Sequence, residues 1–226
     1  MDEQAQARTI LEGRISAAAA LASPYRSVHR ILIAEGKNDR GLRWLAHRAA
    51  EQDVPVVHAP EEQINALAQG TSHGGVLAEV GPRRTLTLDD LVGLSPAPFI
   101  VMLDGIEDPY NFGHALRALY AAGADGLVLR PRNWLSAATT VARSSAGASE
   151  LMPIAVAETA LDAAAFFREQ GLVVACAAAK DAVPVEEADF TQPLFLLIGG
   201  EKRGVTRSFV DQADLRVWIP YGRDFP

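Results

Sequence analysis

The sequence of 226 residues has little cysteine, few aromatic residues and no long apolar run. Its single cysteine, Cys176, excludes an intramolecular disulfide and any metal site built from several cysteines. No run approaches the ~18 apolar residues of a membrane-spanning helix, and the acidic, polar N-terminus lacks the features of a secretory signal. We therefore expect a cytoplasmic protein without a membrane partner. The five histidines show no ligand spacing, so no metal site is predicted.

The composition is otherwise that of a globular protein, with 49% hydrophobic and 22% charged residues. This balance excludes a largely disordered chain. The net charge of −7 argues against a protein that coats nucleic acid without sequence preference. Residues 1–85 carry 10 basic and 10 acidic side chains, whereas residues 86–226 carry 11 and 18. The first part of the chain is therefore repelled less by a polyanion.

Strand and helix patterns alternate in two blocks and predict an α/β fold. We expect a small βαβ-type domain at residues 1–82, a linker at 83–97 with one helical turn at 88–92, and a second domain at 98–226. In the first domain we expect strands at 28–34, 54–58 and 76–80 and helices at 16–22, 38–52 (with Asn38 as N-cap) and 61–68. In the second we expect strands at 99–103, 127–129, 154–157, 172–177, 194–198 and 217–219 and helices at 111–122, 134–143, 161–170 and 206–212. This alternation predicts a parallel sheet, and such sheets bind ligands beyond the carboxyl ends of their strands.

Three strand ends of the second block carry unusual residues. Segment 104–119 (DGIEDPYNFGHALRAL) begins a helix that carries Asn111 and Arg117. Segment 194–205 (LFLLIGGEKRGV) has paired glycines after a buried strand, and segment 217–226 (VWIPYGRDFP) ends a strand at a proline. Each segment taken alone can be an ordinary cap, turn or strand end.

Two common phosphate-binding loops are missing from these strand ends. No GxGxxG follows a predicted strand, and Val205 stands where a P-loop beginning at Gly199 would have its lysine. A dinucleotide-dependent oxidoreductase and a kinase-like domain are therefore disfavoured.

Together and in this order, the N-x-G-x-x-x-R helix start, the GGE loop and the IP-x-G strand end resemble the three signature motifs of the SpoU/TrmH family. These are RNA ribose 2′-O-methyltransferases of the SPOUT class. Segment 144–153 (SSAGASELMP) also resembles the segment between the family's first two motifs, and the first block resembles its small substrate-binding domain. The resemblance implies a parallel-sheet SPOUT-like domain with a trefoil knot, S-adenosylmethionine as cofactor, ribosomal or transfer RNA as substrate, and a homodimer.

The resemblance also assigns roles to residues. Asn111, Arg117 and Glu201 are expected to be catalytic, with Arg117 holding a phosphate and Glu201 orienting Arg117. The residues expected to bind the cofactor are Leu103, Gly199, Gly200, Glu201, Ile219 and Pro220. Basic residues of the first block are expected to contact RNA, with a solvated charged face as the alternative; they are Arg30, Lys37, Arg40 and Arg43.

One departure from the family pattern leaves a second function open. The family's third motif continues past Pro-x-Gly into a further segment and helix, whereas this sequence ends at Pro226. From this we expect a C-terminally truncated form with weakened cofactor binding. The alternative function is a noncatalytic RNA-binding module that retains the methyltransferase fold.

Overall fold

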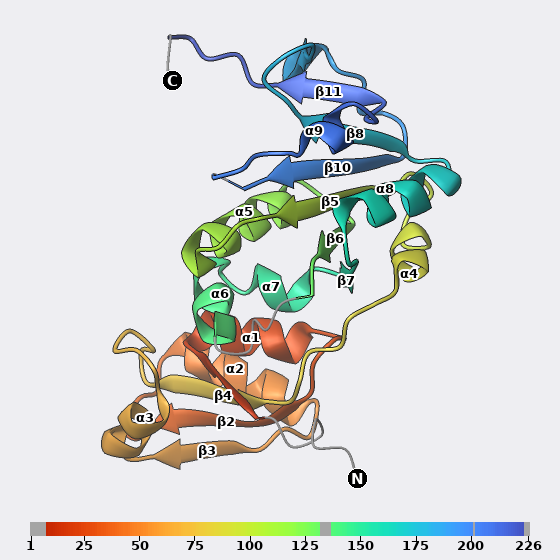
Figure 1. The fold of residues 1–226 in the computed structure, drawn as a ribbon. Helices are drawn as coiled ribbons and strands as arrows, with labels where there is room; N and C mark the ends of the chain where they lie inside the picture. Colours follow the sequence, from red (N-terminus) through yellow and green to blue (C-terminus); the bar gives the residue numbers. More distant parts are fainter. Residues whose placement is uncertain (1–7, 132–136, 201, 224–226) are drawn as a thin grey trace. The chain divides into compact units, whose positions relative to one another are not determined.

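The computed structural model describes residues 8–131, 137–200 and 202–223 (Figure 1). Contacts divide the chain into two compact units. The first unit comprises Met1–Arg84, Asp108–Ala118 and Asn133–Met152, and the second comprises Thr85–Glu107, Leu119–Arg132 and Pro153–Pro226. Two later segments of the sequence, 108–118 and 133–152, therefore belong to the same unit as the N-terminal residues, so the units do not follow the order of the chain.

The first unit is built on a four-stranded mixed sheet in the order β1-β4-β2-β3. Its strands are β1 (Thr9–Glu12), β2 (Val28–Ala34), β3 (Val56–Ala59) and β4 (Val76–Val80). β2 and β3 pair in parallel, as a βαβ unit requires, whereas β4 is antiparallel to both β1 and β2. The sequence analysis missed β1, because a four-residue strand has too few positions to show an alternating pattern.

Helices cover both faces of this sheet. Along β2, Ile31 and Ile33 join the apolar core under α1 (Arg14–Ala22) and α2 (Arg40–Ala50). The alternate residues Leu32 and Ala34 join a smaller core that contains Ile64 of α3 (Glu61–Leu67). Successive side chains of a strand point to opposite faces, which explains why this strand has an unbroken apolar run.

The N-cap of α2 is Asp39, and the prediction of Asn38 was wrong by one residue. Asp39 Oδ1 accepts hydrogen bonds from the backbone N–H groups of Gly41 at 2.7 Å and Leu42 at 3.0 Å. These bonds hold the pKa of Asp39 below its usual value. Asn38 instead offers its side-chain oxygen to the Arg43 guanidinium at 3.2 Å. Asparagine and aspartate are similarly good caps, so sequence alone does not separate them.

The first unit also takes in three helices from these later segments: most of α5 (Pro109–Ala121), then α6 (Ala138–Ser144) and α7 (Ala148–Leu151). Ala142 of α6 is fully buried in the core beneath α1 and α2. The predicted helix at 134–143 corresponds to α6, whose described residues are Ala138–Ser144, and residues 134–136, Trp134 among them, lie outside the described residues. α7 was not predicted, since a helix of four residues shows no periodic pattern.

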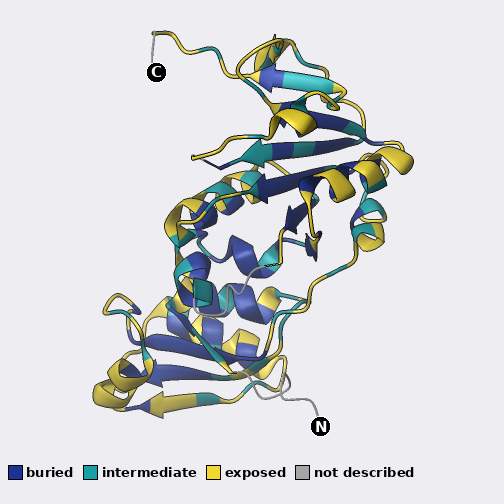
Figure 2. Ribbon diagram, in the orientation of Figure 1, coloured by how far each residue is buried: buried dark blue, intermediate teal, exposed yellow. Residues whose placement is uncertain are grey.

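The second unit contains a seven-stranded sheet in the order β7-β6-β5-β10-β8-β11-β9, and its strand pairs are parallel. Its strands are β5 (Phe99–Asp104), β6 (Gly126–Leu129), β7 (Ile154–Val156), β8 (Val173–Ala177), β9 (Val183–Pro184), β10 (Leu194–Gly199) and β11 (Leu215–Trp218). Figure 2 shows β5 and β6 as mostly buried, which fits their continuous apolar sequences. The parallel α/β fold predicted for this part of the chain is confirmed.

Several boundaries in the second unit differ from the predictions. The helical turn expected at 88–92 is confirmed as α4 (Leu88–Val92), although the segment expected as a linker packs into this unit: Leu91 is fully buried in the core with Phe167 of α8 (Ala160–Glu169). α9 spans only Arg207–Val210 and follows Thr206 as N-cap. β11 ends at Trp218, so Ile219 lies beyond the strand. The two-residue β9 and the 3-10 helix η3 (Val185–Glu187) were not predicted.

Candidate functional site

The C-terminal ends of β5 and β10 lie side by side, because these two strands are parallel neighbours in the middle of the sheet. In their register Leu103 is opposite Ile198, and Asp104 is opposite Gly199. Leu103 is 5% exposed. The structure therefore brings together three of the residues predicted to bind the cofactor: Leu103, Gly199 and Gly200.

Glycines are needed where the loops after these strands meet. A Cβ on Gly200 would lie 2.2 Å from the carbonyl oxygen of Gly105, which itself has a φ of +88°. A Cβ on Gly199 would lie 2.2 Å from the carbonyl carbon of Gly204. The Gly204 N–H donates a hydrogen bond to the Gly200 carbonyl at 2.8 Å, which closes the loop after β10. Backbone atoms therefore line the surface at these strand ends, and a ligand can approach that backbone closely because no side chain stands in the way.

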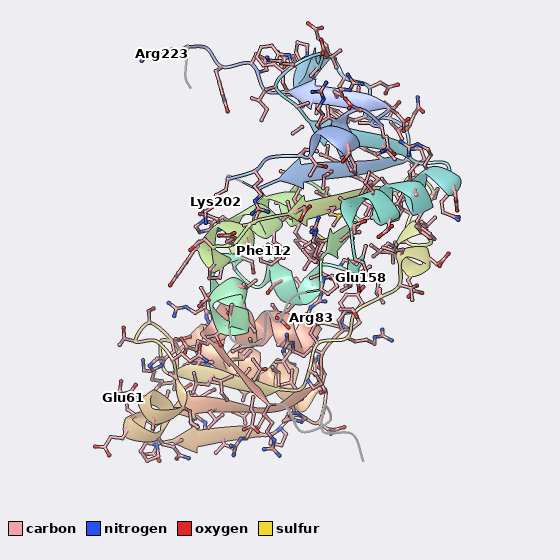
Figure 3. All side chains as sticks on the ribbon, in the orientation of Figure 1. Glu61, Arg83, Phe112, Glu158, Lys202 and Arg223 are labelled. Carbon is pink, nitrogen blue, oxygen red and sulfur yellow. The ribbon has the colours of Figure 1, made fainter. Side chains whose placement is uncertain are left out.

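Two ion pairs flank these glycines within the second unit. Arg130, which follows β6, contacts Asp104 through two nitrogens, with Nε 2.9 Å from Oδ1 and Nη2 3.0 Å from Oδ2. Lys202 Nζ lies 2.7 Å from Glu107 Oε2, and this pair links the loop after β10 to the loop after β5 (Figure 3). The sequence analysis missed Arg130, although its place just after a predicted strand could have identified it.

The remaining residues predicted at strand ends are less closely connected. Ile219 and Pro220 follow β11, which β8 separates from β10 in the sheet order. Ile219 is 67% exposed, and its neighbours Trp218 and Tyr221 are exposed as well. Glu201 lies outside the described residues, so its predicted pairing with Arg117 stays a prediction.

The helix of the first motif, α5, begins at Pro109, a residue that suits the first helical position. Asp108 caps it, because its Oδ1 accepts the Asn111 N–H at 2.8 Å. Asn111 and Arg117 both lie on exposed positions of this helix. Gly113 is buried against α6, where an added Cβ would lie 1.9 Å from Ser144 Oγ. The glycine of the N-x-G-x-x-x-R motif therefore serves helix packing.

The four basic residues predicted to contact RNA differ in their surroundings. Arg30 Nε lies 2.8 Å from the buried Glu79 carboxylate, so its charge is already paired. Arg40 is exposed at the start of α2. Lys37 donates to the Gly74 carbonyl at 3.0 Å, and Arg43 donates to the Asn38 carbonyl at 3.1 Å. Lys37 and Arg43 both line hollows of the first unit, as described below.

Cys176 is fully buried, and burial raises the pKa of its thiol. It belongs to the core of the second unit, as its apolar sequence context indicates. Within the described ranges, no group of three or more His, Cys, Asp or Glu side chains could hold a metal ion. No helix in that part of the chain is both long and apolar enough to cross a membrane.

Comparisons with known proteins match both parts of the chain. Residues 98–226 match the model of the SpoU rRNA methylase family, and residues 10–86 match the RNA 2′-O ribose methyltransferase substrate-binding domain. A 23S rRNA (guanosine-2′-O-)-methyltransferase, RlmB of Pseudomonas putida, is 32% identical over 200 residues, which cover 86% of this chain and 80% of that protein.

Two solved structures share the fold. An RNA 2′-O ribose methyltransferase superposes with a TM-score of 0.78 at 22% identity, covering 99% of this chain and 83% of its own. An AdoMet-bound rRNA methyltransferase from Sinorhizobium meliloti superposes with a TM-score of 0.74 at 23% identity, covering 96% and 79%. These likenesses show that the arrangement of helices and strands is shared.

Proposed function

Because the chain belongs to the SpoU rRNA methylase family, we propose that it transfers a methyl group from S-adenosylmethionine to a ribose 2′-hydroxyl of ribosomal or transfer RNA. The observation that carries this proposal is the backbone-lined surface at the ends of β5 and β10. There, Gly199 and Gly200 leave no room for a side chain, as a closely wrapped cofactor requires. The residues present therefore fit the cofactor.

S-adenosylmethionine, when bound, supplies an electrophilic methyl group on a sulfonium sulfur. The backbone groups of Gly199 and Gly200 would hold it, and the apolar side chains of Leu103 and Ile219, together with Pro220, would form a wall against its adenine. Glu201 is assigned to the same site by its place in the GGE loop. Asp104 does not need to contact the cofactor, because Arg130 already satisfies its carboxylate at 2.9 and 3.0 Å.

Arg117 holds the phosphate next to the reacting ribose. A guanidinium stays protonated in proteins and presents a fork of donors that matches two phosphate oxygens. Arg117 therefore positions the 2′-hydroxyl and stabilises the negative charge that develops on its oxygen. Asn111 lies on the same helix and hydrogen-bonds the ribose, while Glu201 orients Arg117. In this reaction positioning and charge stabilisation supply most of the catalysis.

The test is methyl transfer from labelled S-adenosylmethionine into total cellular RNA. Arg117→Ala is expected to lower the rate by about 100-fold or more, as loss of a group that stabilises developing charge does in other enzymes. Because Arg117 is exposed, the melting temperature and the cofactor affinity should not change. Arg207→Ala, which removes an exposed arginine of α9, is the matched control.

The same assay separates catalysis from the alternative, a noncatalytic RNA-binding module. Unchanged turnover in Arg117→Ala would remove the role assigned to Arg117. RNA binding without any methyl transfer by the unaltered chain would favour the noncatalytic module. Mapping of ribose methylation in cells with and without the protein would then identify the substrate nucleotide.

The proposal includes a homodimer that acts in the cytoplasm, with a small substrate-binding domain at residues 1–82 joined by residues 83–97 to the methyltransferase domain at 98–226. The trefoil knot implied by the family also stays a prediction. The exposed apolar side chains Trp218, Ile219 and Tyr221, which follow one another closely at the end of β11, support a subunit contact. Light scattering that shows only a monomer at micromolar concentration would rule out the dimer.

A further inference from the structure

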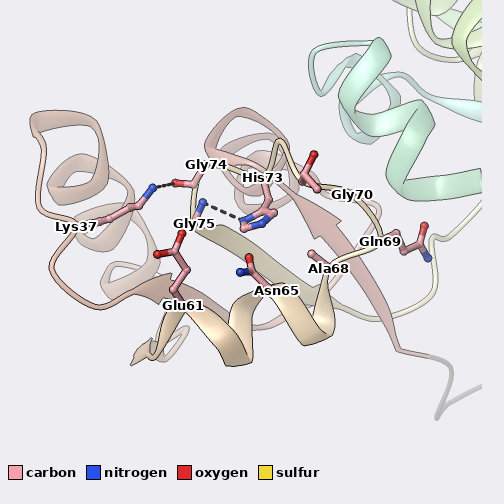
Figure 4. Close-up of a pocket in the computed structure, with 10 residues that line it drawn as sticks. Lys37, Glu61, Asn65, Ala68, Gln69, Gly70, His73, Gly74 and Gly75 are labelled. Carbon is pink, nitrogen blue, oxygen red and sulfur yellow. Dashed lines mark hydrogen bonds between the residues drawn. The ribbon is translucent and has the colours of Figure 1, made fainter.

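We propose that a polar pocket in the first unit binds an unstacked guanine base of the substrate RNA. The proposal rests on the proposed function, because it assumes that the chain binds RNA. The pocket has a volume of about 510 Å³ and lies between α3 and the loop that leads into β4 (Figure 4). It is lined by Lys37, Glu61, Asn65, Ala68, Gln69, Gly70, Thr71, His73, Gly74 and Gly75. None of these residues belongs to the strand ends assigned to the cofactor, so the base is a second recognised part of the substrate.

His73 supplies a hydrogen-bond donor on the wall of the pocket. The residue is 5% exposed, and its Nδ1 accepts the Gly75 N–H at 3.0 Å. The ring proton of the neutral imidazole must therefore be on Nε2. Within residues 8–131, 137–200 and 202–223, no hydrogen bond from His73 Nε2 is found. The Nε2 proton is therefore available to a ligand in the pocket that carries an acceptor.

Glu61 and Asn65 supply the opposite wall. They are four residues apart on α3, so their side chains project from the same face of the helix, and both point toward the loop that carries His73 (Figure 4). An ionised carboxylate accepts hydrogen bonds only, whereas an amide both donates and accepts. The pocket therefore offers two adjacent acceptor oxygens from Glu61 and donors from Asn65 and His73.

Guanine matches this pattern better than the other bases. Its Watson–Crick edge has two neighbouring donors, N1–H and the N2 amino group, which fit one carboxylate. Its O6 and N7 are acceptors, which fit the donors of Asn65 and His73. Sequence-specific RNA recognition usually reads such edges on bases that have left the stack. Uracil offers a single ring donor between two carbonyl acceptors, and adenine and cytosine each offer one amino donor beside a ring nitrogen that accepts.

Lys37 stands at the mouth of the pocket and extends the binding surface. Its Nζ donates to the Gly74 carbonyl at 3.0 Å, and a Cβ on Gly75 would lie 2.8 Å from its Cε, so its stem crosses the glycine. An ammonium has two further donors for a phosphate. A second hollow of about 480 Å³ shares Lys37 and continues to Arg43. The RNA backbone can thus pass from the pocket over Lys37 toward Arg43.

The loop that forms the pocket is held in place from inside the unit. Glu12, whose side chain is fully buried, accepts the N–H groups of Gln69 at 2.5 Å and Gly70 at 3.0 Å. Arg143 of α6 contacts the same carboxylate at 3.1 Å and also donates to Ser72. These contacts fix the loop before RNA arrives, which reduces the entropy lost on binding.

The test is an NMR titration of the full chain with guanosine, adenosine, uridine and cytidine 5′-monophosphates. Guanosine monophosphate is expected to shift the resonances of residues 61–75 and Lys37 and to bind at least ~5-fold more tightly than the other three. Glu61→Gln should weaken its binding by about 10-fold or more, since one bidentate contact carries the discrimination. Glu62→Gln changes the next, exposed carboxylate, which does not line the pocket, and is the matched control.

The outcomes separate this proposal from the proposed function. Equal binding of all four nucleotides, or binding that Glu61→Gln leaves unchanged, would overturn the guanine pocket even if the chain methylates RNA. Selective guanosine monophosphate binding that Glu61→Gln removes would support the pocket even if no methyl transfer is found. In an active enzyme, Glu61→Gln should raise the KM for RNA about 10-fold and leave cofactor affinity unchanged.

Discussion

At the scale of single residues, Glu79 of β4 shows how a buried charge in the first unit is compensated by arginines from other segments of the chain. Its side chain is 6% exposed, and its two oxygens contact Arg8 at 2.5 Å and Arg30 at 2.8 Å. Burial alone would raise the pKa of this carboxyl, but the two guanidinium hydrogen bonds outweigh it, and the pKa lies below the usual 4.5. Arg30 is therefore better explained by this ion pair than by a contact to RNA.

The lowered pKa gives a pH dependence of stability. In the folded state Glu79 binds a proton less readily than in the unfolded state, so it stabilises the fold above pH 4.5 and loses this effect as the pH falls. Glu79→Gln should lower the free energy of unfolding by about 1–3 kcal/mol at neutral pH. Urea unfolding should show this difference shrinking below pH 4.5. A difference that stays constant in acid would contradict the ion pair.

At the scale of helices and strands, the close contact of α5 with α6 determines which residue the first motif can hold. A Cβ on Gly113 would lie 1.9 Å from Ser144 Oγ, 2.8 Å from Ser144 Cβ and 3.0 Å from the Ser145 nitrogen. Only the hydroxyl can rotate away, so any larger residue must push the helices apart. This packing matters for function because α5 carries Asn111 and Arg117 on its exposed positions.

Gly113→Ala is therefore expected to have two opposing effects on the stability of the protein. Alanine favours a helix over glycine by about 1 kcal/mol, whereas overpacking costs about 1–3 kcal/mol. We expect a lower melting temperature and slower methyl transfer, because α5 must shift. Gly93→Ala is the control, since Gly93 has a φ of −73° and its nearest non-neighbouring atom would be 3.7 Å from the new Cβ. A stabilised Gly113→Ala protein would show that the two helices are less tightly packed.

At the scale of the whole molecule, a buried cluster of charges joins distant parts of the chain inside the first unit. Arg26 Nε lies 2.7 Å from Glu150 Oε2, and the two side chains are 5% and 2% exposed. Arg83 donates to the carbonyl groups of Ser149, at 3.0 Å, and Met152. Burial lowers the pKa of Arg83 to about 10, and Glu150 partly opposes this shift. Arg83 therefore remains a cation at neutral pH.

Removal of the Glu150 carboxylate from this cluster should destabilise the protein strongly. Glu150→Gln removes the carboxylate that pairs with the buried Arg26 side chain and lies near the half-buried Arg83, and loss of one member of a buried ion pair typically costs about 3–5 kcal/mol. Thermal and urea unfolding would measure the loss. Glu158→Gln changes an exposed carboxylate of the second unit and should have almost no effect. Equal stability of the two variants would mean that water reaches the cluster in solution.

The parallel α/β fold of the C-terminal part, most of its strands and the family could be predicted from the sequence. Runs such as Phe99–Leu103 are long enough to show that a strand is buried on both faces, and the order of three strand-end motifs is specific. Three short elements were missed, namely β1, α7 and β9, which have two to four residues each and show no periodic pattern. The N-cap residue of α2 could not be predicted either, because Asn38 and Asp39 have nearly equal capping propensities.

The sequence by itself determined which residues lie at strand ends and which chemistry they can support, because apolar periodicity and motif order are local properties of the chain. Only the tertiary structure decided that Gly113 packs against Ser144, that Arg30 is paired with Glu79, and that Glu12, His73 and Arg143 shape a pocket. These contacts join residues far apart in the chain. Their geometry depends on how whole helices and strands pack, and neither composition nor spacing encodes that packing in a readable form.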